Sequence, residues 1–135
     1  MDLSVVIPLY NESESIEELN KWIINALNIE SISFEIIYIN DGSSDGSWNI
    51  IKSLANDSDK IKGISFSKNF GKSQALNSGF IECKGKYVAT LDADLQDSPE
   101  EILEMIDKLK KENLDLISGW KKRRFDSLIL KKIPS

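Results

Sequence analysis

The stretch YVATLDADLQDSPEEI, residues 87–102, places three aspartates directly after an apolar run of strand length. Residues 87–91 form the run, and Asp92, Asp94 and Asp97 follow it. Carboxylates this close together repel one another, and each resists desolvation when it is buried. The stretch therefore predicts a strand that ends at a place where a positive group balances the acidic side chains.

The same order of strand and helix repeats along the rest of the chain. Apolar runs of strand length occupy residues 3–10, 34–41, 61–67, 86–92 and 114–120, and helical spacing occupies residues 14–27, 45–56, 71–83 and 98–113. Four consecutive strand–helix units predict parallel strands with helices on both faces of the sheet. With right-handed crossovers the fold class is α/β, a doubly wound, Rossmann-like sheet. We expect its strands in the spatial order third, second, first, fourth, fifth.

Composition limits the chemistry that is open to this chain. Its 135 residues suffice for one domain with a substantial core, and its net charge of −5 argues against a nucleic-acid partner. It has no histidine, so a metal ion would need oxygen ligands. The single cysteine, Cys83, excludes an internal disulfide and favours a reducing compartment. The first residues lack the pattern of a signal peptide, and no apolar run approaches the roughly 20 residues of a membrane span.

Charge is distributed unevenly along the sequence. Residues 121–135 contain six Lys or Arg and one Asp, whereas the preceding part of the chain is acidic. A basic, partly apolar segment suits anionic lipid headgroups or a phosphorylated acceptor, although a solvated helix start explains any single lysine there. Because the chain stops where a further element should begin, we expect residues 1–135 to be the N-terminal part of a longer catalytic domain.

Polar residues follow each of the first four predicted strands. In open parallel sheets, ligands bind at the carboxyl ends of strands near the point where the strand order reverses. The residues at these ends are Pro8, Tyr10, Asn11, Glu12; Asn40, Asp41, Ser43, Ser44, Asp45; Ser67, Lys68, Asn69, Gly71, Lys72; Asp92, Asp94, Gln96 and Asp97. Four polar strand ends on one edge predict a binding cleft.

The acidic residues of this edge suit a divalent cation. If the first and fourth strands are neighbours, Glu12 and its loop face Asp92 and Asp94, with Gln96 nearby. Mg²⁺ and Mn²⁺ prefer oxygen ligands and commonly bridge one or two carboxylates to substrate phosphates. The sequence therefore predicts that a metal carrying a diphosphate balances the acidic pair. For Asp97, stabilisation of the following helix start is an equally good explanation.

Three further residues of the edge fit a nucleotide. Asp41 lies in INDGSSDGS, where it either forms a turn and helix cap or accepts hydrogen bonds from a nucleobase. Tyr10 is placed to pack against such a base. Lys72 offers a positive charge to phosphates, although a solvated lysine is the common explanation for such a residue alone.

Four segments, in this order, resemble family 2 glycosyltransferases of the GT-A fold. They are VVIPLYNE, NDGSSDGS, KNFGKSQALNSGF and LDADLQDSPEE. Within the family, the chain is most similar to the dolichol-phosphate mannose synthase-like branch, which includes bacterial polyprenyl-phosphate glycosyltransferases. The later segment DLISGWKKRR strengthens this narrower resemblance.

The resemblance implies a transferase that uses a nucleoside diphosphate sugar and a metal ion. For the transfer itself we expect in-line attack with inversion at the anomeric carbon. In such enzymes the position of Asp41 contacts the base, Asp94 is the closer metal ligand, and Gln96 can join the metal. We therefore expect nucleotide-sugar binding by Pro8, Tyr10, Glu12, Asp41, Lys72, Asp92 and Ala93, binding of Mg²⁺ or Mn²⁺ by Asp94 and Gln96, and catalysis by Asp92, Asp94, Arg123 and Arg124. One departure is Asn40, where many relatives have aspartate, which leaves the role of Asn40 open.

The acceptor that the resemblance favours is a polyprenyl phosphate. A phosphate needs no general base, because the second pKa of a phosphomonoester is about 6. It needs cations instead, and four of them, Lys121, Lys122, Arg123 and Arg124, directly follow the fifth predicted strand. We expect such an enzyme at the cytoplasmic face of the membrane, with any membrane contact through parts beyond residue 135. A polysaccharide or glycan hydroxyl as acceptor, and a non-catalytic nucleotide-binding domain, remain the alternatives.

Overall fold

In the computed structural model the described residues are 1–29, 31–112, 116–120 and 127–132. Strands and helices alternate as the sequence predicts. In chain order they are β1 (Leu3–Leu9), α1 (Ile16–Leu27), β2 (Phe34–Asn40), α2 (Ser47–Asp57), β3 (Ile61–Ser65), α3 (Lys72–Glu82), β4 (Tyr87–Thr90), α4 (Glu100–Glu112), β5 (Leu116–Trp120) and β6 (Ser127–Lys132).

The strands form one mixed sheet in the order β3-β2-β1-β4-β6-β5. The first four strands of this order are parallel, and β6 is antiparallel to both of its neighbours. The predicted order is therefore correct from β3 to β4 and wrong beyond, because β6 lies between β4 and β5. The sequence of β6, SLILKK, is a short apolar run followed by two lysines, and we read it as part of a basic segment.

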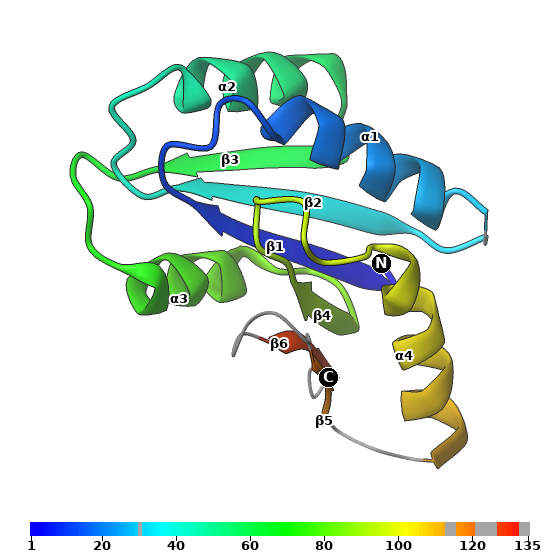
Figure 1. Ribbon diagram of the computed structural model, residues 1–135. Helices are drawn as coiled ribbons and strands as arrows, with labels where there is room; N and C mark the ends of the chain where they lie inside the picture. The colour runs from blue at the N-terminus through cyan, green and yellow to red at the C-terminus, as the bar shows by residue number, and fades with distance from the viewer. Residues whose placement is uncertain (30, 113–115, 121–126, 133–135) are drawn as a thin grey trace.

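Helices cover both faces of the sheet, as predicted. Figure 1 shows α1 and α2 on one face and α3 on the opposite face. The larger core cluster packs residues of α1, α2 and α4 against the sheet, and a smaller cluster holds Ala75 of α3 against Val6, Ile37, Ile39 and Val88. All seven residues of β1 and all seven of β2 are buried, which is typical of central parallel strands.

Helix α3 lies unusually close to the sheet. A Cβ atom added at Gly79 would lie 2.5 Å from Val6 Cγ1 and 2.9 Å from Ile39 Cδ1. Only glycine leaves enough space for this approach. The close packing fixes α3 on β1 and β2, and so fixes the position of Lys72, its first residue.

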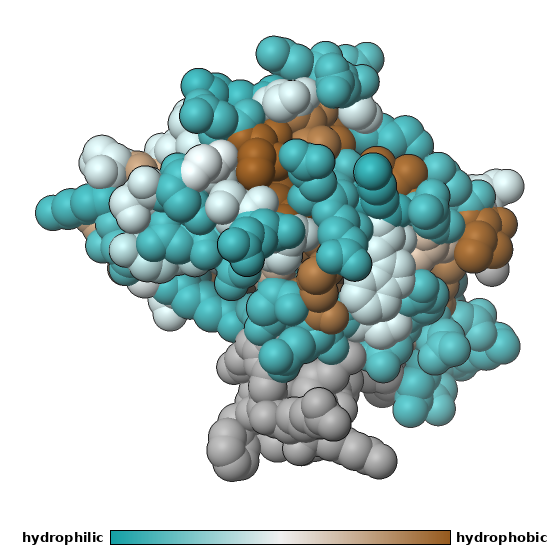
Figure 2. Space-filling view, turned by 45° about the horizontal axis from the view of Figure 1, so that its top comes forward, coloured by the Kyte–Doolittle hydropathy of each residue, from teal (hydrophilic) through white to brown (hydrophobic). Residues whose placement is uncertain are grey.

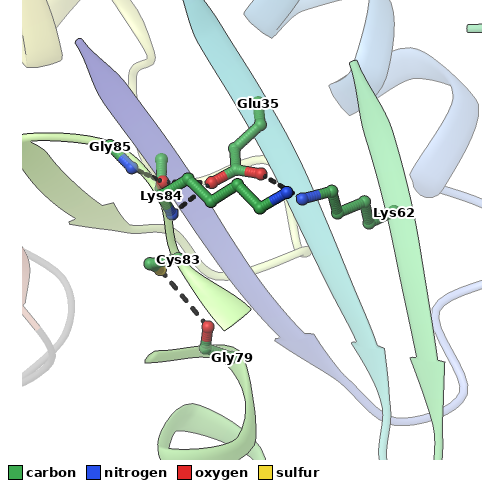
Figure 3. Close-up of polar contacts among 7 residues, drawn as sticks. Glu35, Lys62, Gly79, Cys83, Lys84 and Gly85 are labelled. Carbon is green, nitrogen blue, oxygen red and sulfur yellow. Dashed lines mark hydrogen bonds and ion pairs between the residues drawn. The ribbon is translucent and has the colours of Figure 1, made fainter. Parts of the chain in front are cut away.

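A buried polar cluster lies at the opposite end of the sheet from the predicted site. We call Ser4, Glu35, Lys62, Lys84 and Gly85 the amino-end cluster, since they lie at or just before the amino ends of β1–β4 (Figure 3). The Glu35 carboxylate accepts hydrogen bonds from Ser4 Oγ at 2.5 Å and from Lys84 N at 2.7 Å, and its other oxygen lies 2.8 Å from Lys62 Nζ. Gly85 N donates to Ser4 Oγ at 2.8 Å.

Cys83 lies beside this cluster and is half-buried at the end of α3. Its Sγ atom is 3.2 Å from the carbonyl oxygen of Gly79 (Figure 3). Burial raises the pKa of the thiol to about 11, so the thiolate that reacts with oxidants and electrophiles is scarce at neutral pH. The residue therefore packs the helix end.

The surface of the molecule is mainly hydrophilic on the face that Figure 2 shows, where separate apolar areas lie within polar surroundings. Exposed large apolar side chains come from different elements, for example Ile29 after α1 and Phe80 in α3. Within the described part of the chain, none of the helices combines the length and the apolar character that crossing a membrane requires.

Candidate functional site

A pocket of about 460 Å³ lies where the carboxyl ends of β1, β2 and β4 meet the start of α3. Its lining residues are Pro8, Leu9, Tyr10, Glu12, Asp41, Asn69, Gly71, Lys72, Asp92, Ala93 and Asp94. The strands β1 and β4 pair directly, so the pocket lies where the strand order reverses. This is the place at which open α/β sheets bind ligands.

The pocket brings together most of the residues that the sequence singles out. The predicted residues that line it are Pro8, Tyr10, Glu12, Asp41, Lys72, Asp92, Ala93 and Asp94. Gln96 is exposed and does not line the pocket, although its backbone N–H donates to Asp94 Oδ1 at 3.2 Å. Arg123 and Arg124 lie outside the described residues.

Three lining residues received no role from the sequence. Asn69 and Gly71 were placed at the end of the third predicted strand, and the polar segment between β3 and α3 is the sequence feature that indicates them. Leu9 is the last residue of β1 and reads only as part of an apolar strand. The sequence alone does not distinguish an apolar residue that lines a pocket at a strand end from one that belongs to the hydrophobic core.

The loop after β1 is joined to the loop after β2 by a set of hydrogen bonds. Asn11 has a positive φ of 52°, and its N–H donates to Ser43 Oγ at 2.9 Å. Its side-chain oxygen accepts from Ser44 N at 2.8 Å, and Asp45 Oδ2 accepts from Ser13 N at 3.2 Å. These bonds hold Tyr10, which is 48% exposed, at the edge of the pocket.

Asp45 also fixes the start of α2. Its Oδ1 atom accepts hydrogen bonds from the backbone N–H of Ser47 at 2.9 Å and from the Ser47 hydroxyl. Burial raises the pKa of Asp45, but these hydrogen bonds and those from Ser13 outweigh it and lower the pKa to about 2. Asp45 is therefore ionised and structural, as a turn-forming residue should be.

Asp41 is 5% exposed and binds the loop that precedes α3. Its two carboxylate oxygens accept from the backbone N–H groups of Phe70 at 2.7 Å and Gly71 at 3.0 Å. Asn69 Nδ2 donates to the Asp41 carbonyl oxygen at 3.2 Å. Each carboxylate oxygen has a second lone pair, so these bonds leave the capacity to meet a ligand.

The acidic loop after β4 is held by Asp97, which is 2% exposed. Asp97 Oδ2 accepts from the backbone N–H of Asp92 at 2.9 Å, and Leu95 between them has a positive φ of 66°. Asp97 thus closes the loop that presents Asp92 and Asp94 to the pocket. From outside, the buried hydroxyl of Ser15 donates to the carbonyl oxygen of Ala93 at 2.6 Å. The role of Ser15 depends on a contact with a residue far away in the sequence, which no local sequence pattern reveals.

Lys72 lies against the acidic pair. Its Nζ atom is 3.0 Å from Asp92 Oδ1, and the two side chains are 53% and 17% exposed. The sequence had suggested that a metal with a diphosphate balances Asp92 and Asp94. In the structure a lysine of the pocket already offsets part of the charge of Asp92.

The donor set at this position fits Mg²⁺ or Mn²⁺. Asp92 and Asp94 both line the pocket, and these ions take one or two protein carboxylates and fill their remaining positions with water and phosphate oxygens. Among the described residues no group of three or more His, Cys, Asp or Glu forms a closed metal site. An open pair of carboxylates is the arrangement that leaves room for a substrate diphosphate.

The chain belongs to glycosyl transferase family 2, whose family model matches residues 4–134. It is 35% identical over its whole length to the dodecaprenyl-phosphate galacturonate synthase of Rhizobium johnstonii, of which it covers 40%. It is 38% identical over 96% of its length to the undecaprenyl-phosphate 4-deoxy-4-formamido-L-arabinose transferase of Yersinia pestis, of which it covers 39%. The family model confirms the family that the four segments indicated. Both relatives are named as transferases or synthases of polyprenyl-phosphate sugars.

Solved structures confirm the fold. The mannosyltransferase PcManGT of Pyrobaculum calidifontis, solved in complex with GDP-Man and Mn²⁺, superposes with a TM-score of 0.75 at 20% identity. The superposition covers 96% of this chain and 44% of that one. The GT-A arrangement is thus shared, and the chain spans about two fifths of the length of its curated relatives.

Proposed function

We propose that residues 1–135 are the N-terminal, nucleotide-sugar-binding part of a glycosyltransferase that transfers a sugar to a polyprenyl phosphate. One observation carries the proposal: Asp41, Lys72, Asp92 and Asp94 border a single pocket at the edge where the strand order reverses. The names of the two relatives, both transferases or synthases of polyprenyl-phosphate sugars, support the acceptor.

The pocket residues divide between the two ends of a nucleoside diphosphate sugar. Asp41 and Tyr10 form the end that suits the base, because a carboxylate accepts from ring N–H groups and an exposed aromatic ring stacks. Lys72, Asp92, Ala93 and Asp94 form the end that suits the diphosphate and the sugar. Pro8 and Glu12 line the pocket between the loops after β1 and β4.

Asp92 and Asp94 would hold the metal, with Gln96 as a further oxygen ligand next to them. When bound, Mg²⁺ or Mn²⁺ stabilises the negative charge that develops on the diphosphate leaving group. The protein contributes by orienting the anomeric carbon above the acidic loop, which Asp97 and Ser15 keep in place.

We propose that the acceptor phosphate attacks the anomeric carbon in line, so that the product has inverted configuration. A phosphate is ionised at neutral pH, since its second pKa is about 6, and needs no general base. Cations must hold it instead, and Arg123 and Arg124 are the proposed residues. A polyprenyl chain is a membrane lipid, so we place the reaction at the cytoplasmic face of the membrane.

The direct test is a calorimetric titration of UDP-glucose and GDP-mannose with and without Mn²⁺. We expect one nucleotide sugar to bind in the presence of Mn²⁺, and Asp94→Ala to remove the metal-dependent part of the affinity. Metal-independent binding that Asp94→Ala leaves unchanged would contradict the metal proposal. Turnover by the longer protein with a polyprenyl phosphate, followed by NMR of the anomeric proton, tests the acceptor, and retention of configuration would exclude in-line attack.

A further inference from the structure

We infer that Asp41 is a positioning residue for Lys72, and that through Lys72 it supports the diphosphate end of the donor. This goes beyond the contact with the base that the family resemblance implies for Asp41, and it rests on the proposed function of the pocket. Because Asp41 and Lys72 lie on different loops, the inference depends on the contacts that join them.

The first contact is the binding of the loop between β3 and α3 by the Asp41 carboxylate. Both of its oxygens accept backbone N–H groups of that loop, from Phe70 at 2.7 Å and Gly71 at 3.0 Å. Asp41 is 5% exposed, so water competes little with either hydrogen bond. Hydrogen bonds to an ionised acceptor are stronger than those between neutral groups. The carboxylate therefore determines where the loop ends and where α3 begins.

The second contact limits the loop from the side of Gly42. A Cβ atom at Gly42 would lie 2.2 Å from the carbonyl carbon of Lys68 and 2.4 Å from Asn69 N, and Gly42 has a φ of +75°. A side chain there would force the loop backbone to move. Two residues of the loop after β2 thus position the loop between β3 and α3. Asp41 accepts hydrogen bonds from its backbone N–H groups, and Gly42 leaves space for its backbone.

The third contact carries the position of the loop to the acidic pair. Gly71, which Asp41 binds, directly precedes Lys72, the first residue of α3. Lys72 Nζ lies 3.0 Å from Asp92 Oδ1, and both residues line the pocket with Asp94. A shift of the loop would move the lysine relative to the carboxylates. Asp41 therefore acts on the diphosphate end of the pocket without touching it.

Binding of Mn²⁺-pyrophosphate tests this inference. Pyrophosphate has no nucleobase, so a direct contact between Asp41 and a nucleobase cannot contribute to its affinity. Binding would be measured by calorimetry for the wild-type chain, Asp41→Asn, Lys72→Met and the double variant. We expect each single variant to weaken binding about threefold to fivefold, as for loss of a partly exposed ion pair. We expect the double variant to bind no more weakly than Lys72→Met alone, because Asp41 acts through Lys72.

A second variant keeps the Asp41 carboxylate intact. Gly42→Ala pushes the same loop away, and we expect it to weaken Mn²⁺-pyrophosphate binding to a similar extent. Circular dichroism establishes whether each variant is folded. If Asp41→Asn is not folded, Gly42→Ala takes its place in the double-mutant cycle with Lys72→Met. The controls are Asp59→Asn and Lys52→Met, which remove exposed charges outside the pocket and should leave the affinity unchanged.

Other outcomes separate the inference from the proposed function. If Asp41→Asn weakens nucleotide-sugar binding but leaves Mn²⁺-pyrophosphate binding unchanged, Asp41 serves only the base, and the inference is wrong. Additive losses in the double variant would also contradict it, because Asp41 would then act independently of Lys72. If the wild-type chain binds a nucleotide sugar but no pyrophosphate, only the inference fails, whereas binding of neither ligand overturns both.

Discussion

The two ends of the parallel strands both carry carboxylates, but in opposite surroundings. At the amino ends, Glu35 is 1% exposed, and its oxygens are held by Ser4, Lys62 and the backbone of Lys84. At the carboxyl ends, Asp92 and Asp94 border a pocket of about 460 Å³. At the amino ends the strands themselves supply Ser4, Glu35 and Lys62, whereas at the carboxyl ends the loop after β4 supplies the acidic pair.

The contrast shows how structural and ligand-binding carboxylates can be told apart. The amino-end cluster surrounds Glu35 with three groups of its own fold, the Ser4 hydroxyl, the Lys84 N–H and the Lys62 ammonium. The loop after β4 uses Asp97 to direct Asp92 and Asp94 toward open space. We therefore expect changes at the amino end to affect the free energy of unfolding, and changes at the carboxyl end to affect ligand binding.

The largest effect on stability should come from Glu35→Ala. The substitution leaves the buried hydroxyl of Ser4 and the partly buried backbone N–H of Lys84 without their acceptor. Each such loss costs about 1–3 kcal/mol, so we expect the free energy of unfolding to fall by about 3 kcal/mol in urea denaturation. Binding of a nucleotide sugar by the folded fraction should not change.

Glu35→Gln is the matched variant for this experiment. It keeps a side-chain oxygen that can accept from Ser4 or Lys84 but removes the charge that faces Lys62. We expect a smaller loss of stability than with Glu35→Ala. If both variants unfold at the wild-type urea concentration, the amino-end cluster does not stabilise the fold.

Asp94→Ala should have the opposite profile. The side chain lines the pocket, so its removal should weaken Mn²⁺-dependent binding of a nucleotide sugar at least about tenfold, or about 1.4 kcal/mol. The free energy of unfolding should change by no more than about 0.5 kcal/mol, as for most surface substitutions. Calorimetry and urea denaturation measure the two quantities on the same sample. A large loss of stability with unchanged binding would reverse the contrast between the two ends.

The sequence predicts the parallel part of the fold because its signals are local. Residues 3–10 and 34–41 are mainly apolar runs of strand length, and the observed β1 and β2 are buried throughout. The position of β6 could not be predicted in this way. Its pairing with Tyr87–Thr90 of β4 is a long-range contact, and an antiparallel strand between β4 and β5 does not follow from the repeated strand–helix order.

In the candidate site, too, local features could be predicted from the sequence and long-range contacts could not. Residues that border the pocket were predicted because strand ends and acidic motifs are visible in the sequence, as with Asp92 and Asp94. The contacts that support the pocket were not predicted, because the two partners of each contact are distant in sequence. Ser15 meets Ala93, and Asp41 meets Gly71, across separations that only the folded chain closes.

Lys62→Met separates the ion pair of the amino-end cluster from its hydrogen bonds. Lys62 is 36% exposed and lies 2.8 Å from Glu35, so water can replace part of its interaction. We expect a loss of about 1 kcal/mol, smaller than with Glu35→Ala, in urea denaturation. Lys52→Met, at an exposed lysine of α2, is the control. An effect as large as that of Glu35→Ala would mean that the ion pair, and not the hydrogen bonds, dominates the cluster.

The smallest effect is a dependence of stability on acid pH. Burial alone raises the pKa of Glu35, but bonds from Lys62, Ser4 and Lys84 outweigh it and lower the pKa below its ordinary value of 4.5. The stabilisation from Glu35 is therefore fully present above about pH 4.5 and is lost as the pH falls through the lowered pKa. Urea denaturation between about pH 6 and pH 3 should show a shallower decline for Glu35→Gln than for the wild-type chain. Parallel curves would mean that Glu35 titrates alike in the folded and unfolded chain.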